Sequence, residues 1–377
     1  MIRLLLTLFL CIPVSPLRAA AGIDASGPRI RVAILRGSPA IKLKSAAKIF
    51  VTEVKTGQKY QLVPNASYEI SASGGMITVA GQRISSPVKL MTADGGDRMR
   101  FSGRLYKGDI LLRAAGPGRL DIIESLSLED YLCGVLPAEM SPDWPLEALK
   151  AQAVASRTYA LKQLNPSKDY DITDGVEMQV YKGSAVTSPR IAEAVYSTKG
   201  EILRYKKKLV TAFFHACCGG HTTATSSAWG EDLIKPLSGV ADSFCSDSHH
   251  YRWELFIASR DLLTFIQKQG STALKIKGVK MHKKDRSGRS ISLKFSTDQG
   301  NTTALVKELR NYAGTFEFKS TYITKITPVK NGYEFEGRGW GHGVGMCQEG
   351  AKTMANQGRL YRKILRHYYP GAAIERI

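Results

Sequence analysis

The sequence predicts an α+β fold, in which a β-rich N-terminal domain precedes a mixed α/β domain. Short alternating apolar runs fill residues 29–115, a segment with helical spacing of apolar and small residues occupies 145–164, and β-like runs return around a helical segment within 251–330. The chain has 377 residues and is 43% hydrophobic. This is enough for two domains of ordinary globular composition.

The first residues have the pattern of an export signal. Arg3 precedes an apolar run over 4–14, and the small residues 19–21 fit an A-x-A cleavage site. The run is too short to span a bilayer, which needs roughly 20 residues, and no later segment approaches that length. The sequence therefore predicts a signal peptide over 1–21, no transmembrane segment, and a mature protein in the periplasm or cell envelope. Lipid attachment at Cys11 is a minor alternative.

Turn-rich composition predicts the domain boundaries. Residues 22–118 form the β-rich N-terminal domain, with β-like runs such as 30–35 and 76–80, and AAGPGRL at 114–120 marks its end. Residues 119–377 form the second domain, with 251–335 as an inserted β-rich subdomain.

Helix signals occur mainly in the second domain. Ser127 and Asp130 make a capping-box-like pair that begins a short helix, which we expect Pro137 to stop after Leu136. A longer helix is predicted from 145 to 164, because its apolar and small residues recur every three to four positions. Further helices are predicted at 189–199 and in DLLTFIQKQG, at 261–270.

The charge is strongly positive. Lys and Arg number 53 against 33 Asp and Glu, a net charge of +20. A basic excess attracts polyanions. Nucleic acid is the first candidate for a cytoplasmic protein, but behind a signal peptide anionic envelope polymers are the better one. A charged surface that only maintains solubility is the alternative.

The stretch LPAEMSPDWP, residues 136–145, places Glu139 among three prolines and a tryptophan. Prolines break helices, so we expect Glu139 at a chain reversal and treat it as a candidate site residue. The alternative is a carboxylate that complements the N-terminal dipole of the following helix.

Four blocks occur in order after residue 119. They are DYLCGVLPAEMSPDWPLEALKAQAVASRTYAL (130–161), DITDGVEMQVYKG (171–183), FFHACCGGHTTATSSAWG (213–230), and GWGHGVGMCQEGAKTMANQG with ILRHYYPGA (339–372). Together they resemble the SpoIID/LytB family, the bacterial stage II sporulation protein D and its amidase-enhancer relatives. The resemblance covers about residues 120–377.

The resemblance implies a peptidoglycan lytic transglycosylase that cuts MurNAc–GlcNAc bonds of denuded glycan strands and leaves 1,6-anhydro-MurNAc ends. It places the family's catalytic glutamate at Glu139. An acid with a raised pKa in an apolar niche suits this chemistry. Only hydrolysis needs a second carboxylate, for which Asp143, Asp171, Asp174 and Glu177 remain open.

Two functions of other classes remain open. LytB-type relatives imply a non-catalytic peptidoglycan-binding activator of a cell-wall amidase. The charge alone also allows a polyanion-binding envelope protein with no role in the wall, whose binding would follow salt concentration and not sugar identity.

Five residues are predicted to bind substrate. His342 and Gln348 come from the glycine-rich block, Gln179 and Tyr181 suit sugar contacts, and Arg157 suits a muramic carboxylate. Structural alternatives are a buried histidine, core packing of the QVY segment, and an ordinary ion pair for Arg157. The family's serine after the methionine is Cys347 here.

Cysteines and histidines suggest a metal site. Behind the predicted signal peptide five cysteines remain, an odd number in an oxidising compartment. Zinc prefers His and Cys ligands, and some relatives are expected to bind it. The predicted zinc ligands are His215, Cys218 and Cys245, with His221 or His249 as a fourth. A disulfide from Cys217 or Cys218 to Cys245 is the alternative.

Overall fold

The computed structural model describes residues 27–93, 99–101, 103–175, 178–184 and 188–377. It has several sheets and several helices, which confirms the α+β class. The predicted signal peptide lies outside the described residues. No described helix is both long enough and apolar enough to cross a bilayer.

The chain divides into two compact units. Unit 1 comprises residues 1–131 and 165–185, and unit 2 comprises 132–164 and 186–377. The segment 165–185 therefore packs with the N-terminal residues, although the sequence places it after the expected boundary at 118. Parallel pairing of Val32 with Ile172 attaches this segment to the edge of a unit 1 sheet.

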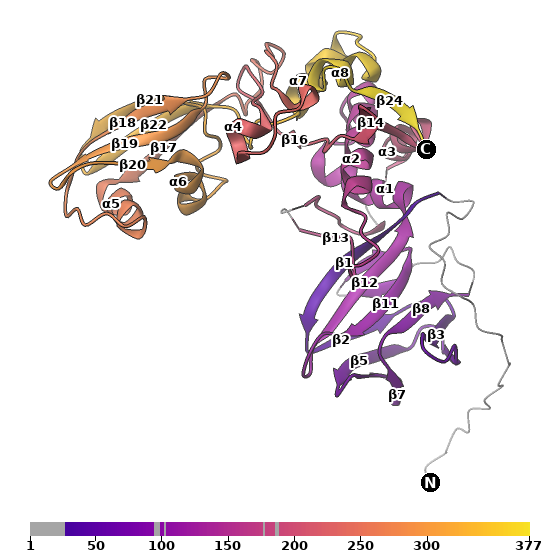
Figure 1. Cartoon of the computed structure of the whole chain (residues 1–377). Helices are drawn as coiled ribbons and strands as arrows, with labels where there is room; N and C mark the ends of the chain where they lie inside the picture. The colour runs from indigo at the N-terminus through magenta and orange to yellow at the C-terminus, as the bar shows by residue number, and fades with distance from the viewer. Residues whose placement is uncertain (1–26, 94–98, 102, 176–177, 185–187) are drawn as a thin grey trace. The chain divides into compact units, whose positions relative to one another are not determined.

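Unit 1 contains two sheets whose strands alternate buried and exposed residues, as the sequence predicts. The larger sheet has the order β13-β1-β12-β11-β8-β3-β4 and the smaller β10-β9-β2-β5-β6-β7. The strands are β1 (Arg29–Ser38), β2 (Ala40–Lys44), β3 (Ile49–Glu53), β4 (Lys59–Leu62), β5 (Ser67–Ser73), β6 (Met76–Val79), β7 (Gln82–Ser85), β8 (Val88–Thr92), β9 (Met99–Phe101), β10 (Arg104–Tyr106), β11 (Asp109–Ala114), β12 (Leu120–Ser127) and β13 (Ile172–Thr173). Figure 1 shows β1, β12 and β11 side by side.

Helix α1 (Leu128–Glu139) is longer than predicted. It begins as expected, since the Asp130 backbone N–H donates to Ser127 Oγ over 3.1 Å. The expectation that Pro137 ends the helix is wrong. Pro137 lies in the last turn, where the missing N–H removes one bond of a helix that ends two residues later.

Helix α2 (Leu146–Gln163) confirms the long predicted helix and is buried around most of its circumference. Its small side chains allow neighbouring elements to approach closely, and α3, α7, α8 and β14 all contact it. The other elements of unit 2 outside the insertion are α3 (Pro189–Ser197), β14 (Glu201–Tyr205), β15 (Lys208–Leu209), β16 (Phe214–His215), α4 (Thr225–Trp229), the 3-10 helix η2 (Lys235–Leu237), β23 (Met346–Cys347), α7 (Gln348–Asn356), α8 (Tyr361–Tyr368) and β24 (Ala373–Arg376).

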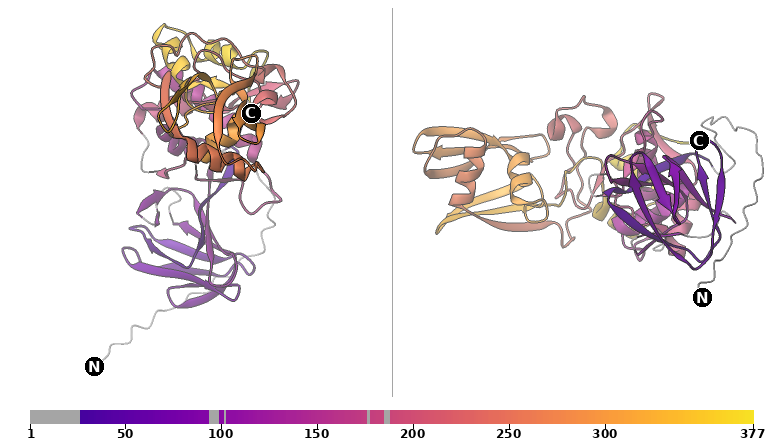
Figure 2. Two further views of the ribbon diagram at one scale, coloured as in Figure 1. Left: turned by 90° about the vertical axis from the view of Figure 1, so that its left-hand side faces the viewer. Right: turned by 90° about the horizontal axis from the view of Figure 1, so that it is seen from below.

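The inserted segment of unit 2 has its own core, with Phe265, Phe295, Phe318 and Phe335 at its centre. Two three-stranded sheets, β17-β22-β21 and β18-β19-β20, form it with two helices. Its elements are β17 (Arg252–Ala258), α5 (Ser259–Lys268), β18 (Ile276–Lys284), β19 (Ser290–Thr297), β20 (Gly300–Leu305), α6 (Val306–Ala313), β21 (Ile323–Val329) and β22 (Gly332–Arg338). Both helices lie on the same side of the sheets (Figures 1 and 2).

Candidate functional site

Glu139 is the last residue of α1 and is half-buried. Met140 follows it, 2% exposed, and its N–H donates to Leu136 O over 2.8 Å. The N-terminal turn of α2 already carries a different acid, Glu147. Glu139 therefore lies at the negative end of the α1 dipole.

The loop from Met140 to Pro145 is held by two helices of unit 2. The Lys352 ammonium of α7 lies 4.7 Å from the centre of the Trp144 ring. Arg190 of α3 donates from Nε to the Trp144 carbonyl over 3.2 Å. Buried Met140 and half-buried Trp144 thus place apolar surface directly after Glu139, which is the kind of environment a catalytic acid requires.

The candidates for a second carboxylate have different surroundings. Asp143 is exposed in the same loop. Asp171 is buried and accepts hydrogen bonds from the backbone and side chain of Arg31, so it is a structural anchor of unit 1. Asp174 forms an ion pair with Arg104 at 3.4 Å. Glu177 lies outside the described residues.

Gln348 begins α7 and is 6% exposed. Its Nε2 donates to Gln152 Oε1 over 3.4 Å, and Gln152 in turn donates to Ser156 Oγ over 3.0 Å. These contacts join α7 to α2 through buried polar groups. Gln348 therefore positions the loop that precedes α7 and presents little surface to a ligand.

His342 lies in a cluster of rings from three of the sequence blocks. Its ring centre is 5.2 Å from Trp229, 5.4 Å from His215 and 6.0 Å from Phe213. Tyr159 of α2 contacts the same cluster through Phe213, with ring centres 5.9 Å apart. Sequence blocks more than 180 residues apart thus meet here, and Trp229, which is 39% exposed, gives the cluster an accessible ring face.

The two histidines of this cluster are neutral at pH 7. Burial, together with the positive charges of Arg289 and Arg310, lowers the pKa of His342 to about 4. Burial likewise lowers the pKa of His215. The Val344 N–H donates to His342 Nδ1 over 3.0 Å, so a neutral His342 carries its proton on Nε2.

Arg157 is completely buried and caps the C-terminal end of α3. It donates from Nη2 to Val195 O over 3.0 Å and from Nη1 to Glu201 O over 3.1 Å. A guanidinium at the C-terminus of a helix satisfies carbonyls that have no partner within the helix. The structure gives Arg157 a packing role, and we propose no ligand contact for it.

Gln179 and Tyr181 are each 1% exposed in unit 1. The Tyr131 hydroxyl donates to Gln179 Oε1 over 3.2 Å, and the Tyr181 hydroxyl donates to Glu124 Oε2 over 2.8 Å. Tyr131 and Tyr181 also stack, with ring centres 5.3 Å apart. This network fixes the QVY segment to β12, and the side chains predicted to face sugar belong to the core.

Four buried thiols meet in unit 2, and none forms a disulfide. The Sγ atoms of Cys218 and Cys245 are 3.4 Å apart, and both lie within 4.8 Å of Cys347 Sγ and an Asp242 oxygen. Hydrogen bonds with Cys217, Cys218 and Cys347 lower the pKa of the Cys245 thiol, whereas burial raises the pKa of the Cys218 and Cys347 thiols. Cys217 lies beside these groups, and we call the four thiols the cysteine cluster. The ligand atoms near enough to one another to share a metal ion are those of Cys218, Cys245, Cys347 and Asp242.

Backbone N–H groups point at the sulfurs of this cluster. Cys218 N donates to Cys347 Sγ over 3.2 Å, Gly220 N to Cys218 Sγ over 3.3 Å, and Gly350 N to Cys347 Sγ over 3.4 Å. Such donors stabilise thiolates. A cluster of thiolates with these donors can hold a metal ion.

The histidines predicted as ligands lie elsewhere. His215 Nδ1 is 3.0 Å from Val344 O, and His221 Nδ1 is 2.6 Å from Thr222 O. Cys218 and Cys245 are the two predicted ligands that the structure brings together. Among the described residues one further group could hold a cation, and it combines His249 with His250 and Glu349.

Comparisons with known proteins identify the family of this chain. The family model of the stage II sporulation protein SpoIID matches residues 117–205, the segment that contains Glu139. A stage II sporulation protein D of Bacillus amyloliquefaciens is 30% identical over 279 residues, which cover 67% of this chain and 75% of the relative. An uncharacterized protein of Brachyspira hyodysenteriae is 34% identical over 289 residues, or 74% of each chain.

The chain belongs to the SpoIID family. It is also similar to the amidase enhancer of Bacillus subtilis, at 29% identity over 375 residues, covering 85% of this chain and 52% of the enhancer. A second family model, a domain of unknown function (DUF8618), matches residues 227–345. That match includes the whole insertion and begins near the Trp229 ring.

Several residues of this SpoIID-family chain went unnoticed in the sequence. Asp242 has no other candidate ligand next to it in the sequence, and Arg289 follows a basic segment that is typical of an exposed hairpin turn. Glu124 sits in an ordinary alternating strand. Trp229 is the next-to-last residue of the third sequence block, and its aromatic side chain was the one available signal.

Proposed function

We propose that this SpoIID-family protein is an exported peptidoglycan lytic transglycosylase in which Glu139 is the catalytic acid and base. The observation that carries the proposal is the place of Glu139, half-buried at the end of α1 and followed by buried Met140. The family relationship supports it. Export belongs to the proposal, because peptidoglycan lies outside the cytoplasmic membrane.

One carboxyl group suffices for this reaction. Protonated Glu139 gives its proton to the oxygen that joins MurNAc to GlcNAc, and the bond to the anomeric carbon breaks. The resulting carboxylate then accepts the proton of the MurNAc C6 hydroxyl, whose oxygen bonds to the anomeric carbon. The product is a 1,6-anhydro ring, and Glu139 ends protonated, ready for another cycle.

Glu139 lies at a helix C-terminus and is followed by apolar side chains. The last turn of a helix presents the negative end of the helix dipole, which disfavours a carboxylate. Apolar surface from Met140 and Trp144 acts in the same direction by reducing hydration. Asp143 is the nearest other acid along the chain, and it is exposed.

The test uses purified protein and denuded glycan strands, with the products identified by mass spectrometry. We expect anhydro-muramyl ends from the wild type and none from Glu139→Gln. Glu193→Gln makes the same chemical change at an exposed helical position of unit 2, and should leave the products unchanged. Reducing ends in place of anhydro ends would show a hydrolase, and cleavage by Glu139→Gln would refute the assignment.

A second candidate function is activation of a cell-wall amidase. The similarity to the amidase enhancer favours it, although this chain spans only 52% of that protein. In that case the protein would bind glycan without making new ends, and would increase stem-peptide release by an added amidase. Glu139→Gln would not change this stimulation.

We also propose that the cysteine cluster holds a structural zinc ion. The ligands would be Cys218, Cys245, Cys347 and Asp242, whose ligand atoms all lie within 4.8 Å of one another. Thiolates at Zn–S distances of about 2.3 Å lie about 3.8 Å apart around a tetrahedral ion, close to the 3.4 Å between the Sγ atoms of Cys218 and Cys245. A disulfide would need about 2.05 Å. Four protein ligands leave no open position for water, so the ion would stabilise the fold and take no part in cleavage.

Metal analysis of the reduced protein tests the zinc proposal. We expect one zinc ion per chain, lost in Cys245→Ser. Cys133→Ser changes a buried cysteine of α1 and should retain the metal. A metal-free protein with a Cys218–Cys245 disulfide in non-reducing mass spectrometry would contradict the proposal.

A further inference from the structure

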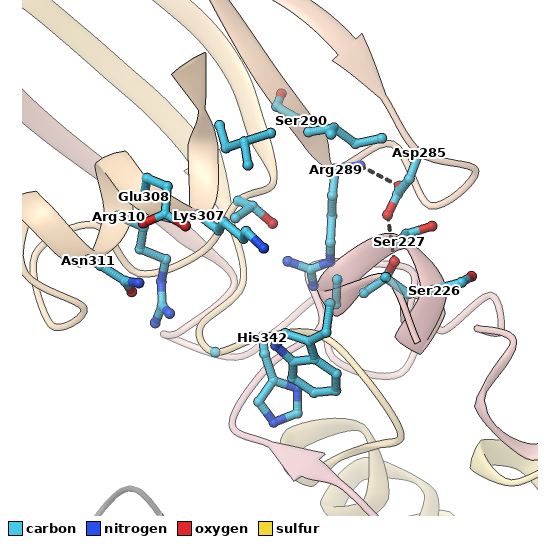
Figure 3. Close-up of a pocket in the computed structure, with 18 residues that line it drawn as sticks. Ser226, Ser227, Asp285, Arg289, Ser290, Lys307, Glu308, Arg310, Asn311 and His342 are labelled. Carbon is cyan, nitrogen blue, oxygen red and sulfur yellow. Dashed lines mark hydrogen bonds between the residues drawn. The ribbon is translucent and has the colours of Figure 1, made fainter. Parts of the chain in front are cut away.

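A pocket of about 510 Å³ lies between α4 and the insertion in unit 2. α4 contributes Trp229, β19 and the turn before it contribute Ser290 and Arg289, and α6 contributes Lys307. His342 lies at one side of the pocket (Figure 3). The pocket thus adjoins the ring cluster of the candidate site, within the segment matched by the domain of unknown function.

Arg289 carries a buried charge with no carboxylate salt bridge among the described residues, and its guanidinium lies 5.6 Å from the centre of the Tyr322 ring. The residue is 2% exposed, and its Nη2 donates to Cys218 O over 2.6 Å. Its Nε and Nη1 find no hydrogen-bond partner in the described ranges, and neither does the buried hydroxyl of Ser290 beside it. Buried groups of this kind are normally satisfied, so a ligand or water must meet them.

Burial lowers the pKa of Arg289, and the charge of Asp285 offsets only part of this effect. Asp285 accepts hydrogen bonds from the Thr223 hydroxyl over 2.5 Å and from the Ser287 hydroxyl over 2.6 Å. Its contact with Arg289 is through the backbone N–H, at 3.0 Å. Among the described residues the Asp285 carboxylate therefore serves the turn that carries Arg289 and makes no salt bridge with the guanidinium.

A second cation points at the first. In Figure 3 the Lys307 side chain extends from α6 toward the Arg289 guanidinium. Like charges that face each other across a cavity repel, and an anion between them removes the repulsion. The remaining lining acid, Glu308, is on the same helix as Lys307 and lies farther from Arg289 (Figure 3).

An aromatic ring completes the pocket. Trp229 is 39% exposed and packs against His342 at 5.2 Å. Indole faces suit the C–H surface of a sugar ring, and paired cations suit a carboxylate.

We propose that this pocket binds a carboxylate-bearing sugar, with the carboxylate between Arg289 and Lys307 and the sugar ring against Trp229. The choice of sugar rests on the proposed function, since N-acetylmuramic acid is N-acetylglucosamine with a lactyl carboxylate added. The pocket would select the muramyl residue of a glycan strand, whether the protein then cleaves the strand or only binds it.

Calorimetric titration of full-length Glu139→Gln protein tests this, because binding is then measured without cleavage. We expect N-acetylmuramic acid to bind at least tenfold more tightly than N-acetylglucosamine. Lys307→Met should remove most of that ratio, and Trp229→Ala should weaken both sugars. Lys283→Met removes an exposed lysine of the insertion that does not line the pocket, and should change neither.

Three results would overturn the proposal. The first is equal affinity for the two sugars, and the second is an affinity for free lactate that matches N-acetylmuramic acid. The third comes from Arg289→Lys. If it lowers the zinc content and keeps the sugar ratio, Arg289 only offsets the thiolate charges. If the cleavage test shows that Glu139 is not catalytic, the ratio of the two sugar affinities is unaffected. Failure of the proposed function and failure of the pocket proposal are therefore distinguishable.

Discussion

A buried carboxyl in unit 1 predicts how stability depends on pH. Desolvation raises the pKa of Glu124 from 4.5 to about 7, and hydrogen bonds from the Gly108 backbone and the Tyr181 hydroxyl offset part of the rise. The folded protein therefore keeps a proton that the unfolded chain releases above about pH 4.5. This contribution to stability is fully present below pH 4.5 and is lost as the pH rises through 7.

The size of the effect follows from the two pKa values. At about 1.4 kcal/mol per pKa unit, the interval from 4.5 to about 7 corresponds to a total loss of about 3.5 kcal/mol, most of it between pH 4.5 and 7.5. Glu124→Gln keeps an acceptor oxygen for Tyr181 but cannot titrate. Compared with the variant, the wild type should lose about 3 kcal/mol of unfolding free energy between pH 4.5 and 7.5.

Urea unfolding at several pH values measures this difference. Glu69→Gln, at an exposed position of β5, is the control and should follow the wild type at every pH. If Glu124→Gln and the wild type show the same pH dependence, Glu124 is ionised in the folded protein and the reasoning fails. The same series with Tyr181→Phe should show lower stability without altered glycan binding.

Two further predictions concern unit 2. Arg157→Met should lower the unfolding free energy by about 2–6 kcal/mol, because two buried carbonyls lose their donor. Thermal unfolding measures this loss. Arg260→Met changes an exposed arginine and is the control, with an unfolding free energy expected within about 0.5 kcal/mol of the wild type. If Arg157→Met is as stable as the wild type but binds glycan poorly, Arg157 contacts the ligand after all. Gly350→Ala should reduce zinc retention, because the added methyl would overlap the Tyr368 hydroxyl and an Asp242 oxygen. Unchanged metal content in that variant would show that Asp242 does not support the cluster.

Local patterns predicted much of the fold. The period-2 strands of unit 1 and the small-residue face of α2 depend on side chains close in sequence, which a single chain displays directly. The position of Pro137 gave the wrong end for α1, because a proline in the last turn of a helix removes few hydrogen bonds and destabilises the helix little. The place of residues 165–185 depends on parallel pairing with β1, a long-range contact that no local signal announces.

The site was predictable where its residues share a block. Glu139 and His342 stand out by composition. The side chains of Gln179 and Tyr181 face the core because their polar partners, Tyr131 and Glu124, lie 48 and 57 residues earlier in the chain.

Two of the predicted zinc ligands, Cys218 and Cys245, meet in the cysteine cluster, whereas the predicted histidines are not part of it. Cys347 comes close to Cys218 through the parallel pairing of β16 with β23, a long-range contact, so spacing along the chain favoured the nearer histidines.

The cysteine cluster also lies at the base of the insertion. Cys217 exchanges two backbone hydrogen bonds with Trp340, of 3.0 and 2.8 Å, directly after β22. Gly339 N–H donates to Tyr251 O over 2.8 Å, which joins the two ends of the insertion. Gly219 has φ +75°, and a side chain there would overlap Arg338. The turn that carries the thiols is thus packed against the strand ends of the insertion.

This arrangement predicts what zinc removal does. Arg289 reaches from the insertion to the Cys218 carbonyl, so a loosened cysteine cluster displaces one wall of the pocket. Chelation should increase amide exchange at the ends of β17 and β22 and reduce selectivity for N-acetylmuramic acid. Exchange in α1 should change much less, since the described contacts of the cluster do not include that helix. Equal loss of protection in α1 and β22 would mean that the metal supports the whole of unit 2, and not the base of the insertion.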